Sequence, residues 1–469
     1  MKKSNVRKYI LYLVFAILFL IRLINISNPP LDYSSWRQVD TDSIARNFIE
    51  YKFNIFYPQL NYDGPMPNYV QLELQVTTFI IAILYKIFGY SPICARIVPI
   101  LFFMGSCYYL FLIVRRKSGF NAAIMTVLLY GILPINIIYS RNIMPESALM
   151  FFMLGGIYYF ILFIDKNKNA YYFLSTIFTT LAVLTKVPAA FIGIPMIYLA
   201  VKKYGVNIFL NIKLIIFPVI IFGLSYSYFA WLGNIAEYKF VSEIGSLMIM
   251  PNFLNSIFKE QTLKYLAQQF LGKVFTVPGI VLFAVGIVQK KKKEEYFYYF
   301  WLFGAVLHII IVDAVIHLDY YLMVITPIIT IFMGITAAKM FAIKKYSYIL
   351  LISIVIIILT NVIFLKDAYS IEKLYITIGN HVSQYTKKSD LIIINNDSPE
   401  LFYTSDRKGF RLYGDLLTTE NIEKLISEGA NYFIPYKAEL DKDIKNYLER
   451  KFYKITFPDG YFIYKLSLY

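Results

Sequence analysis

Apolar runs of about twenty residues recur along this chain from Tyr9 to Leu365 and then stop. A run of that length can cross a hydrocarbon core of about 30 Å as a helix. Composition agrees, because 58% of the residues are hydrophobic and 16% are charged, where soluble domains carry roughly 25% charged residues. The sequence therefore predicts an all-α polytopic membrane region. It excludes a single soluble core, disorder, collagen and a coiled coil.

The net charge of +16 lies entirely in the membrane region. Residues 366–469 hold 15 basic and 15 acidic residues, whereas residues 1–365 hold 31 basic and 15 acidic ones. A basic excess confined to membrane-spanning sequence is a topology signal and not a nucleic-acid-binding surface. We therefore expect no nucleic acid partner.

Basic residues gather at six places in that region, and the positive-inside rule puts all six on the cytoplasmic side. They are Lys2, Lys3, Arg7 and Lys8; Arg115 to Lys117; Lys166 and Lys168; Lys202 and Lys203; Lys290 to Lys293; and Lys344 and Lys345. An even number of crossings must separate each pair, which gives about eleven transmembrane helices. The predicted spans are 9–25, 93–114, 119–139, 147–164, 170–185, 187–201, 209–231, 273–289, 296–314, 320–342 and 346–365. The N-terminus is then inside, and residues 366–469 are outside.

A long loop, residues 26–92, is predicted to lie outside between the first two spans. It contains two apolar stretches that are short for a crossing and fit juxtamembrane helices better. The first, Thr41–Tyr51, carries apolar residues at helical spacing, and the second is Val76–Gly89. We count the loop with the transmembrane domain, residues 1–365.

Residues 366–469 are predicted to form a small extracytoplasmic α/β domain. Strands are expected at Leu391–Asn395 and Tyr432–Pro435, an amphipathic helix at Thr419–Ser427, and a hairpin of Phe452–Phe457 and Tyr461–Leu466 across Asp459-Gly460. Strands that alternate with a helix indicate a partly parallel sheet. We assign no functional site to this domain.

Ionisable residues at the edges of the predicted spans concentrate on the outer face. They lie in Trp36–Asp42, Arg141–Glu146, Thr185-Lys186 and His317–Tyr321. Charged groups at such positions are costly and therefore point to function. No single motif is specific. Their occurrence together on one face is what indicates a functional site there.

Each of these residues also has an ordinary structural interpretation. Asp40 could cap the helix that we expect to begin at Thr41. Asp42 and Arg46 stand four residues apart and would form a helix ion pair. Asp40 has no basic residue four positions ahead, so its carboxylate is the less neutralised of the two and the better candidate base.

The other candidates have structural alternatives at the membrane surface. Arg141, Glu146 and Lys186 could be interfacial anchors whose side chains reach toward headgroups. His317 could be an interfacial histidine with its hydrogen bonds satisfied. Tyr320 and Tyr321 could belong to the aromatic belt of a chain that has 42 tyrosines.

Several common chemistries find no motif here. The chain has no phosphate-binding loop, no dinucleotide fingerprint and no Ser/His/Asp order, and its three histidines do not favour a histidine zinc site. No cofactor is predicted, and the need for a divalent metal ion stays open.

The ordered set of short motifs resembles the GT-C fold glycosyltransferases that use polyprenyl-phosphate sugars. The group is that of the protein O-mannosyltransferases and the aminoarabinose transferase of lipid A, glycosyltransferase family 39-like. The motifs are Trp36–Thr41; Leu72-Glu73 before Leu84–Gly89; Ala95-Arg96; Ser140-Arg141 with Pro145-Glu146; Leu184–Lys186; and His317 with Tyr320-Tyr321 before Pro327. They cover most of residues 30–330.

The resemblance implies roles for individual residues. Asp40 occupies the place of the catalytic base, and Glu146 occupies the second acidic position, with Arg141 beside it. Lys186 and His317 match positions that approach the lipid-linked phosphate or the sugar. Relatives often carry adjacent Asp-Glu where this chain has Asp40-Thr41-Asp42, which leaves open whether Asp40 or Asp42 is the base. The substrate-binding residues expected are Arg37, Asp42, Arg46, Glu73, Arg141, Glu146, Lys186, His317, Tyr320 and Tyr321.

The implied reaction fits the placement of these residues. A polyprenyl-phosphate donor stays in the bilayer, so its site must lie at the membrane surface. Transfer needs a carboxylate to deprotonate the acceptor and cations to stabilise the departing lipid phosphate; Arg141, Lys186, Arg37 and Arg46 are the candidate cations. The expected partners are this donor, membrane lipid, and an acceptor that is a protein, a lipid or a glycan. The location expected is the cell membrane, with the site outside.

Two other functions stay open from the sequence. A polytopic lipid or solute transporter, or a flippase, would also have many spans with buried charges. However, the ionisable residues lie at loop edges, and Asp313, near the end of its span, is the nearest exception. The third interpretation is a subunit of polysaccharide assembly whose C-terminal domain binds glycan without catalysis.

Overall fold

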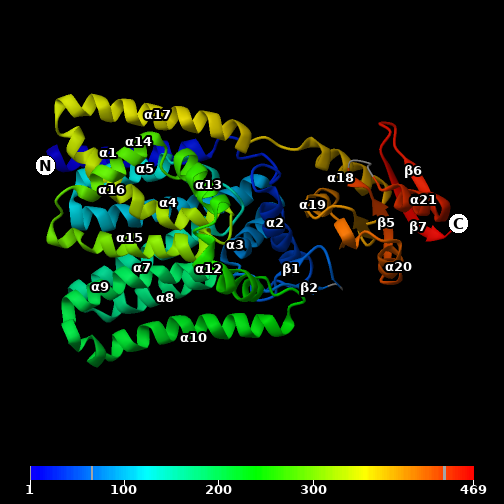
Figure 1. Cartoon of the computed structure of the whole chain (residues 1–469), viewed down its shortest axis with the longest axis horizontal. Coiled ribbons are helices and arrows are strands. Elements are labelled where there is room, and N and C mark those ends of the chain that lie inside the picture. The colour runs from blue at the N-terminus through cyan, green and yellow to red at the C-terminus, as the bar shows by residue number, and fades with distance from the viewer. Residues whose placement is uncertain (1, 65–66, 437–439, 469) are drawn as a thin grey trace.

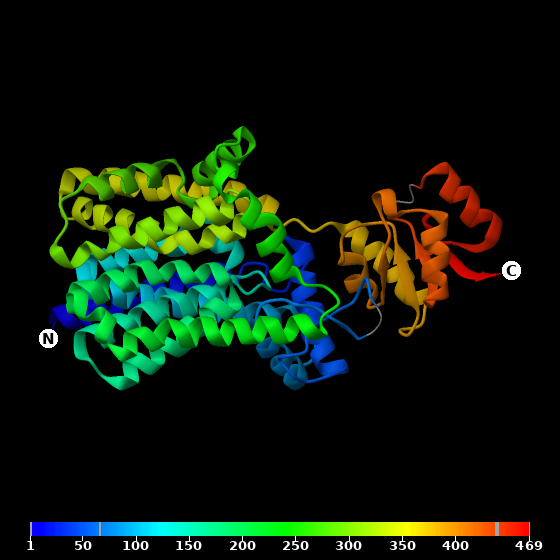
Figure 2. The same ribbon diagram turned by 60° about the horizontal axis from the view of Figure 1, so that its bottom comes forward.

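The computed structural model describes residues 2–64, 67–436 and 440–468 and consists of a long helical bundle with an α/β unit beyond one end (Figure 1). The view turned by 60° shows the same arrangement (Figure 2). The N-terminus lies at the end of the bundle that is remote from the α/β unit. The predicted domain boundary, between residues 365 and 366, falls inside the last helix of the bundle.

Helices cover most of each of the eleven predicted spans. Their bounds are α1 Lys2–Arg22, α4 Pro92–Ser118, α5 Phe120–Ile132, α6 Pro134–Tyr139, α7 Glu146–Lys166, α8 Asn169–Thr185, η1 Val187–Ile192, α9 Gly193–Tyr204, η2 Gly205–Leu210, α10 Ile212–Ile235, α14 Val277–Val288, η5 Lys293–Glu295, α15 Phe297–His308, η6 Ile309–Asp313, η7 Asp319–Ile325, α16 Thr326–Phe341 and α17 Lys344–Ala368. The bundle is therefore helical throughout, as predicted.

Seven helical segments of the described chain are long and apolar enough to cross a membrane, or eight if one bent pair counts as a single span. The bent pair is Glu260–Val274 with Val277–Val288, at an angle of 95°. Val76–Phe88 and Phe120–Ile132 are shorter apolar helices. These criteria use length and composition only, so the count of about eleven crossings stays a prediction.

The centre of the bundle is formed by α7 and α16, whose apolar stretches are 83% and 89% buried. A side chain on Gly334 of α16 would place its Cβ 2.6 Å from the Cα of Thr126 on α5, so these two helices meet at backbone distance. The apolar stretches of α10 and α17 are only 22% and 17% buried. These two helices therefore lie on the perimeter, where lipid would cover them.

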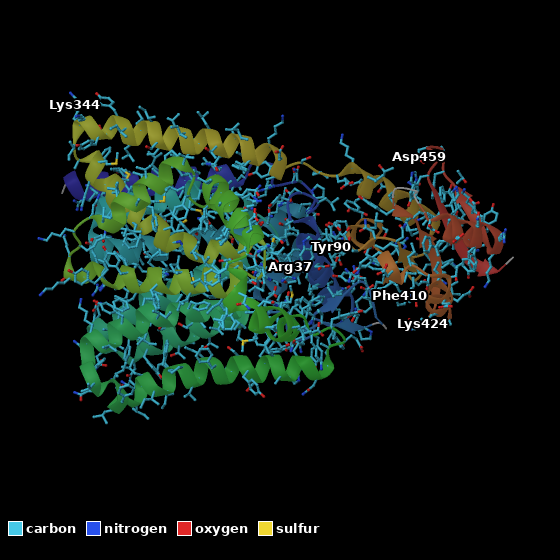
Figure 3. The ribbon with its side chains drawn as sticks, viewed as in Figure 1. Arg37, Tyr90, Lys344, Phe410, Lys424 and Asp459 are labelled. Carbon is cyan, nitrogen blue, oxygen red and sulfur yellow. The ribbon has the colours of Figure 1, made fainter. Side chains whose placement is uncertain are left out.

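Several of the basic clusters meet at one end of the bundle. Arg7 lies over the ring of Phe120, just past the Arg115–Lys117 cluster, and Arg116 pairs with Asp165 at 2.6 Å. Lys202 donates a hydrogen bond to the carbonyl of Lys293 at 2.9 Å. Lys344 lies at the bundle end opposite Arg37 (Figure 3). This separation agrees with the expected asymmetry, and the membrane side of each end stays a prediction.

The external loop contains α2 Ser35–Glu50, α3 Val76–Phe88 and a small antiparallel pair, β1 Gln59–Leu60 with β2 Asn68–Tyr69. The α3 helix was predicted. The start of α2 at Thr41 was wrong: the helix begins at Ser35, so Asp40 lies within it and does not cap it. The buried face of this extra turn is polar and includes Arg37, Gln38 and Asp40. No apolar periodicity therefore marks it in the sequence.

A second region, residues 232–272 between the predicted spans 209–231 and 273–289, had no predicted element. It instead contains α11 Phe240–Glu243, η3 Ile244–Ile249, α12 Met250–Ser256, α13 Glu260–Gln269 and η4 Phe270–Val274. In α11 and η3, apolar side chains lie on more than one face. The sequence therefore shows no clear helical period there. This region lies beside the external helices at the same end of the bundle (Figure 1).

The C-terminal unit has a five-stranded sheet in the order β4-β3-β5-β7-β6. Strand β3 is parallel to β4 and β5, and β7 is antiparallel to β5 and β6. The bounds are α18 Lys373–Tyr385, β3 Leu391–Ile394, α19 Glu400–Ser405, β4 Lys408–Arg411, η8 Gly414–Leu416, α20 Thr419–Ser427, β5 Ala430–Ile434, α21 Lys442–Lys451, β6 Phe452–Thr456 and β7 Phe462–Leu468. The partly parallel sheet, the helix at 419–427 and the hairpin are confirmed. Strand β4 was missed because its four residues mix charge with glycine.

A buried charge cluster fastens the external loop to the bundle. The carboxylate of Asp32 accepts hydrogen bonds from Arg96 at 3.0 Å and from Arg141 at 3.0 Å, and none of the three side chains is more than 1% exposed. Further donors of the two guanidinium groups reach the carbonyls of Asn25 and Pro29 at 2.8 and 3.0 Å. One carboxylate thus joins the loop, α4 and the turn before α7.

We expect Asp32→Asn to lower the free energy of unfolding by about 3–5 kcal/mol, because it leaves two buried guanidinium groups without a counter-charge. Thermal unfolding in detergent would measure the loss. The control is Asp165→Asn, which breaks an exposed pair with Arg116 and should cost about 0–1 kcal/mol. Equal effects of the two changes would show that the buried cluster has no special role.

Candidate functional site

A cavity of about 490 Å³ lies where the external helices meet the bundle and the C-terminal unit. Its volume is within the roughly 300–1,000 Å³ of small-molecule sites. Its walls come from α2, β1, the segment between β2 and α3, the α8–η1 connection, α10, η3, η6, η7 and β4. Most lining side chains are apolar or aromatic, and the polar ones include Arg37, Asp40, Glu73, Lys186, Tyr320, Tyr321 and Arg411.

Asp40 projects from α2 at one wall of the cavity. The side chain is buried, and both carboxylate oxygens are within hydrogen-bond distance of the Tyr62 hydroxyl, at 3.1 and 3.0 Å. Burial raises the pKa of Asp40 to about 7, against the opposing effects of Arg37, the Tyr62 hydrogen bond and Arg411. A carboxyl group tuned to that value suits proton abstraction near neutral pH.

Asp42, the competing candidate base, faces away from the cavity. Its carboxylate pairs with Arg46 at 3.0 Å, as the spacing predicted, and accepts a hydrogen bond from the Tyr85 hydroxyl. No described residue forms an ion pair with Asp40. The geometry therefore distinguishes two carboxylates that the sequence left as alternatives.

Besides Arg411, two cations line the cavity. Lys186, at the C-terminal end of α8, pairs with Glu146, and its ammonium lies 4.4 and 4.1 Å from the ring centres of Tyr320 and Tyr321. Arg37, one turn before Asp40 on α2, pairs with Glu73. An ammonium has three N–H donors and a guanidinium five. Each group therefore keeps donors for a ligand beyond its carboxylate partner.

Tyr320 is held in place by a hydrogen-bonded network around the neighbouring Asp319. The Asp319 carboxylate accepts from Tyr33 at 2.8 Å, from Lys273 at 2.5 Å and from Tyr139. Lys273 also donates to the Tyr33 hydroxyl at 2.7 Å. The network joins the external loop, α6, η4 and η7, and so fixes the wall that carries the two tyrosines.

An apolar groove adjoins the cavity on the membrane side. It has a volume of about 250 Å³ and is lined by side chains of α7, α8, η1, α9, η2 and α10, and Ala190 belongs to the walls of both spaces. The helix α10 lies on the perimeter of the bundle. The cavity and this apolar groove thus share a wall residue, and the groove lies next to the perimeter of the bundle.

Some predicted site residues do not reach the cavity. Arg141 is fully buried against Asp32, and Arg46 lies under the C-terminal unit, where it donates to the Tyr403 hydroxyl at 2.8 Å. The ring of His317 stacks on Tyr265 at 4.6 Å and lies 3.1 Å from the hydroxyl of Thr262. Glu146 stands behind Lys186. Contacts of these four with substrate stay a prediction.

Arg141 and Lys186 are not interfacial anchors. Arg141 has no exposed surface, and Lys186 is enclosed by Glu146 and the two tyrosine rings. A snorkelling side chain extends its charge into water, whereas these two end in ion pairs inside the protein. Tyr320 likewise lies inside the protein, 5% exposed, and not in an aromatic belt.

Three residues that line the cavity or hold its wall in place were not identified from the sequence. Tyr62 is one of 42 tyrosines, Lys273 begins the predicted span 273–289 and was not singled out, and Arg411 belongs to a domain to which no site was assigned. No local pattern marks any of them. Their roles follow only from contacts between segments that are distant in the chain.

Within residues 2–64, 67–436 and 440–468, no group of three or more His, Cys, Asp or Glu side chains is arranged to hold a metal ion. The need for a divalent metal ion therefore stays open. The acidic residues of the site are instead paired with cations or with tyrosine hydroxyls.

Comparison with known proteins identifies the fold. The family model described as dolichyl-phosphate-mannose-protein mannosyltransferase matches residues 75–231. The crystal structure of ArnT from Cupriavidus metallidurans bound to undecaprenyl phosphate covers 97% of this chain and 98% of its own, with a TM-score of 0.65 at 10% identity. The chain has the GT-C fold. The resemblance expected from the sequence is thereby confirmed.

Two further relatives extend the comparison. The archaeal oligosaccharyltransferase AglB from Archaeoglobus fulgidus, in complex with an inhibitory peptide and a dolichol-phosphate, matches 98% of this GT-C chain and 74% of its own, with a TM-score of 0.56 at 11% identity. An uncharacterized protein from Aquifex aeolicus is 30% identical over 131 residues, 27% of this chain and 26% of that protein. The aligned segment thus spans about a quarter of that relative.

We expect Tyr62→Phe to raise the pKa of Asp40 above 7, because the hydroxyl stabilises the charged carboxylate. In the native protein the Asp40 carboxyl should lose its proton as the pH rises through about 7, and in the variant at a higher pH. Infrared difference spectra of the protonated carboxyl between pH 5 and 9 would measure both titrations, with Asp40→Asn to assign the band. An unchanged midpoint would contradict this role of Tyr62.

Proposed function

We propose that this chain is an integral membrane glycosyltransferase that moves a sugar from a polyprenyl-phosphate donor to an acceptor on the extracytoplasmic face, with Asp40 as the general base. One observation carries the proposal. A buried carboxylate without an ion-pair partner and two cations, Lys186 and Arg37, line a single cavity at the end of the bundle remote from Lys344.

The proposed reaction is a direct displacement at the anomeric carbon. Asp40 accepts the proton of the acceptor hydroxyl while the oxygen forms a bond to that carbon. The bond between the carbon and the phosphate oxygen breaks, and the electron pair leaves with the polyprenyl phosphate. One displacement inverts the anomeric configuration. The proton then leaves Asp40 for water, which restores the carboxylate.

Lys186 and Arg37 are proposed to stabilise the charge that develops on the departing phosphate. Both lie in a low-dielectric setting, where a fixed cation is worth more than in water. Their partners, Glu146 and Glu73, keep them charged and in place before substrate arrives. The aromatic rings of Tyr320 and Tyr321 hold the Lys186 ammonium from a second side.

The apolar groove next to the cavity supports a lipid-linked donor. An isoprenoid chain needs an apolar path that begins at the phosphate. The wall residue Ala190 shared by the cavity and the groove supports such a path. The solved GT-C neighbours contain undecaprenyl phosphate and dolichol-phosphate, which supports the same class of donor here.

The extracytoplasmic side is proposed from charge. The clusters at Arg115–Lys117, Lys202 and Lys203, and Lys290–Lys293 lie away from the cavity, as the positive-inside rule requires of the opposite face. With the site on the outer face, the donor would be a lipid-linked sugar already present in the outer leaflet. The acceptor stays undefined as to protein, lipid or glycan.

Asp40→Asn should reduce sugar transfer by about 10²–10⁴-fold, because the amide cannot accept the proton. The measurement is release of polyprenyl phosphate from a panel of polyprenyl-phosphate sugars in detergent. Asp42→Asn is the matched control: it makes the same chemical change two residues away and should retain transfer within about tenfold. The opposite pattern would make Asp42 the base. Failure of the native protein to consume any donor would favour the transporter.

Lys186→Met should lower the rate of transfer by about 10²–10³-fold, as does loss of one charge-stabilising donor in other enzymes. It also leaves Glu146 buried without a cation, which costs stability. The double variant Lys186→Met, Glu146→Gln removes both charges and should regain native thermal stability while remaining slow. Native transfer rates in the double variant would exclude Lys186 from the reaction.

A further inference from the structure

The C-terminal unit reaches the cavity through the end of β4. Arg411, the last residue of that strand, lines the cavity together with Asp40 and Tyr62. The sequence alone does not indicate that Tyr62 and Arg411 meet, because nearly 350 residues separate them. The unit is therefore part of the wall of the proposed active site.

Backbone hydrogen bonds dock the external loop against the edge of the C-terminal sheet. The amide of Gly409 donates to the carbonyl of Asn61 at 3.0 Å, and the amide of Asp63 donates to the carbonyl of Gly409 at 2.9 Å. Tyr62 and Gly409 form a parallel bridge. On the other side of β4, a Cβ at position 409 would lie 1.8 Å from the carbonyl oxygen of Ile392. Glycine at 409 thus lets three chain segments pack together.

The guanidinium of Arg411 is fixed by this docking. Its Nε donates to the Asp63 carboxylate at 2.6 Å, and another nitrogen donates to the carbonyl of Asp397 at 2.6 Å. The backbone amide of Arg411 donates to the same carboxylate at 2.7 Å. With these donors engaged, the group is placed to orient its neighbours more than to bind a substrate.

Tyr62 is held between two side chains of the C-terminal unit. The Arg411 guanidinium lies 4.2 Å from the centre of the Tyr62 ring, and the ring of Phe402 stacks on it at 5.8 Å. The hydroxyl of the same tyrosine reaches both oxygens of Asp40. The hydrogen bond to the proposed base therefore depends on residues from the C-terminal unit.

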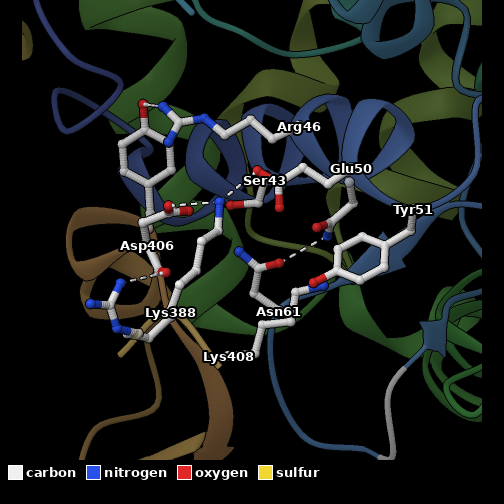
Figure 4. A pocket seen from close by; sticks show the side chains of 11 residues that line it. Ser43, Arg46, Glu50, Tyr51, Asn61, Lys388, Asp406 and Lys408 are labelled. Atoms are coloured by element: carbon white, nitrogen blue, oxygen red, sulfur yellow. Dashed lines mark hydrogen bonds and ion pairs between the residues drawn. The ribbon is translucent and has the colours of Figure 1, made fainter. Parts of the chain in front are cut away.

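The C-terminal unit also contacts α2, the helix that carries Asp40. The hydroxyl of Ser35 donates to Glu400 at 2.5 Å, and Lys388 pairs with Glu50 at 2.9 Å. Figure 4 shows Ser43, Arg46 and Glu50 of α2 facing Lys388, Asp406 and Lys408 of the unit. Both ends of α2 thus contact the C-terminal unit.

We propose that Arg411 is a positioning residue for the transfer reaction: it holds Tyr62 against Asp40 and favours the charged form of that carboxylate. The inference rests on the proposed function, since it assigns Asp40 the role of base. It makes the C-terminal unit a part of the catalytic site and not a separate binding module. The charged and titratable groups that act on Asp40 are Arg37 from α2, Tyr62 from the loop, Arg411 from β4 and Glu400 from α19.

The test compares pH profiles of transfer for the native protein, Arg411→Met and Arg411→Lys. Loss of the cation should move the acid limb of the Arg411→Met profile upward by about one pH unit, since a nearby opposite charge lowers a carboxyl pKa by about 1–3 units. Its rate at the plateau should also fall, because Tyr62 loses its support. Arg411→Lys keeps the charge, so its limb should move less than that of Arg411→Met, while its plateau falls because an ammonium lacks the planar fork.

The matched control is Arg450→Met, which removes one positive charge from an exposed position on α21 in the same unit. Its profile should equal the native one. The infrared titration of the Asp40 carboxyl repeats the measurement without turnover, so a slow Arg411→Met variant still gives an answer. A native limb and plateau in Arg411→Met, or the same shift in Arg450→Met, would overturn the inference.

Failure of the proposed function would look different. If Asp40→Asn transfers sugar at the native rate, Asp40 is not the base, and the acid limb belongs to another group. If Asp40→Asn is inactive while Arg411→Met keeps the native profile, the proposed function stands and the positioning role of Arg411 falls.

Discussion

A polar helix is buried at the centre of the site, and the arrangement of the protein follows from the cost of burying it. The side chains of Arg37, Gln38, Asp40 and Asp42 on α2 have almost no contact with solvent. Buried polar and charged groups need partners. Most of those partners come from the external loop and from α2 itself: Glu73 pairs with Arg37, Tyr62 donates to Asp40, and Arg46 pairs with Asp42. The bundle adds a contact from Arg96 to Gln38, and the C-terminal unit adds one from Tyr403 to Arg46.

The partners also divide the charges of the site into separate roles. Asp32 neutralises Arg96 and Arg141 away from the cavity, and Arg46 neutralises Asp42 beneath the C-terminal unit. Their charges are used to build the site. What remains at the cavity is Asp40, which has a hydrogen bond but no ion pair, and the cations Lys186, Arg37 and Arg411, each of which is paired with a carboxylate. This remainder has the composition that a base and a phosphate-stabilising pair require.

The position of the cavity relates this chemistry to the membrane. Its polar side is closed by the external loop and by β4, and on another side it shares the wall residue Ala190 with the groove next to α10. A substrate with a charged head and an isoprenoid tail matches that division. A transporter would need a path that opens to both faces, whereas the charged groups here lie at one end of the bundle.

The sequence by itself determined the elements whose signals are local. Apolar runs fixed the helices of the bundle, alternation and turn residues fixed the hairpin at Asp459-Gly460, and the spacing of Asp42 and Arg46 fixed their ion pair. The same spacing indicated that Asp40 is the less neutralised carboxylate. These signals lie within a few residues of each other, so they survive in a single sequence.

Only the tertiary structure decided which charges meet. It made Arg141 a partner of Asp32, placed the candidate cap residue Asp40 inside α2, and brought Arg411 onto the ring of Tyr62, which hydrogen-bonds to Asp40. These contacts join segments tens to hundreds of residues apart, and no period or motif encodes them. Their energy comes from satisfying buried charges together, and that condition exists only once the bundle, the loop and the C-terminal sheet have packed.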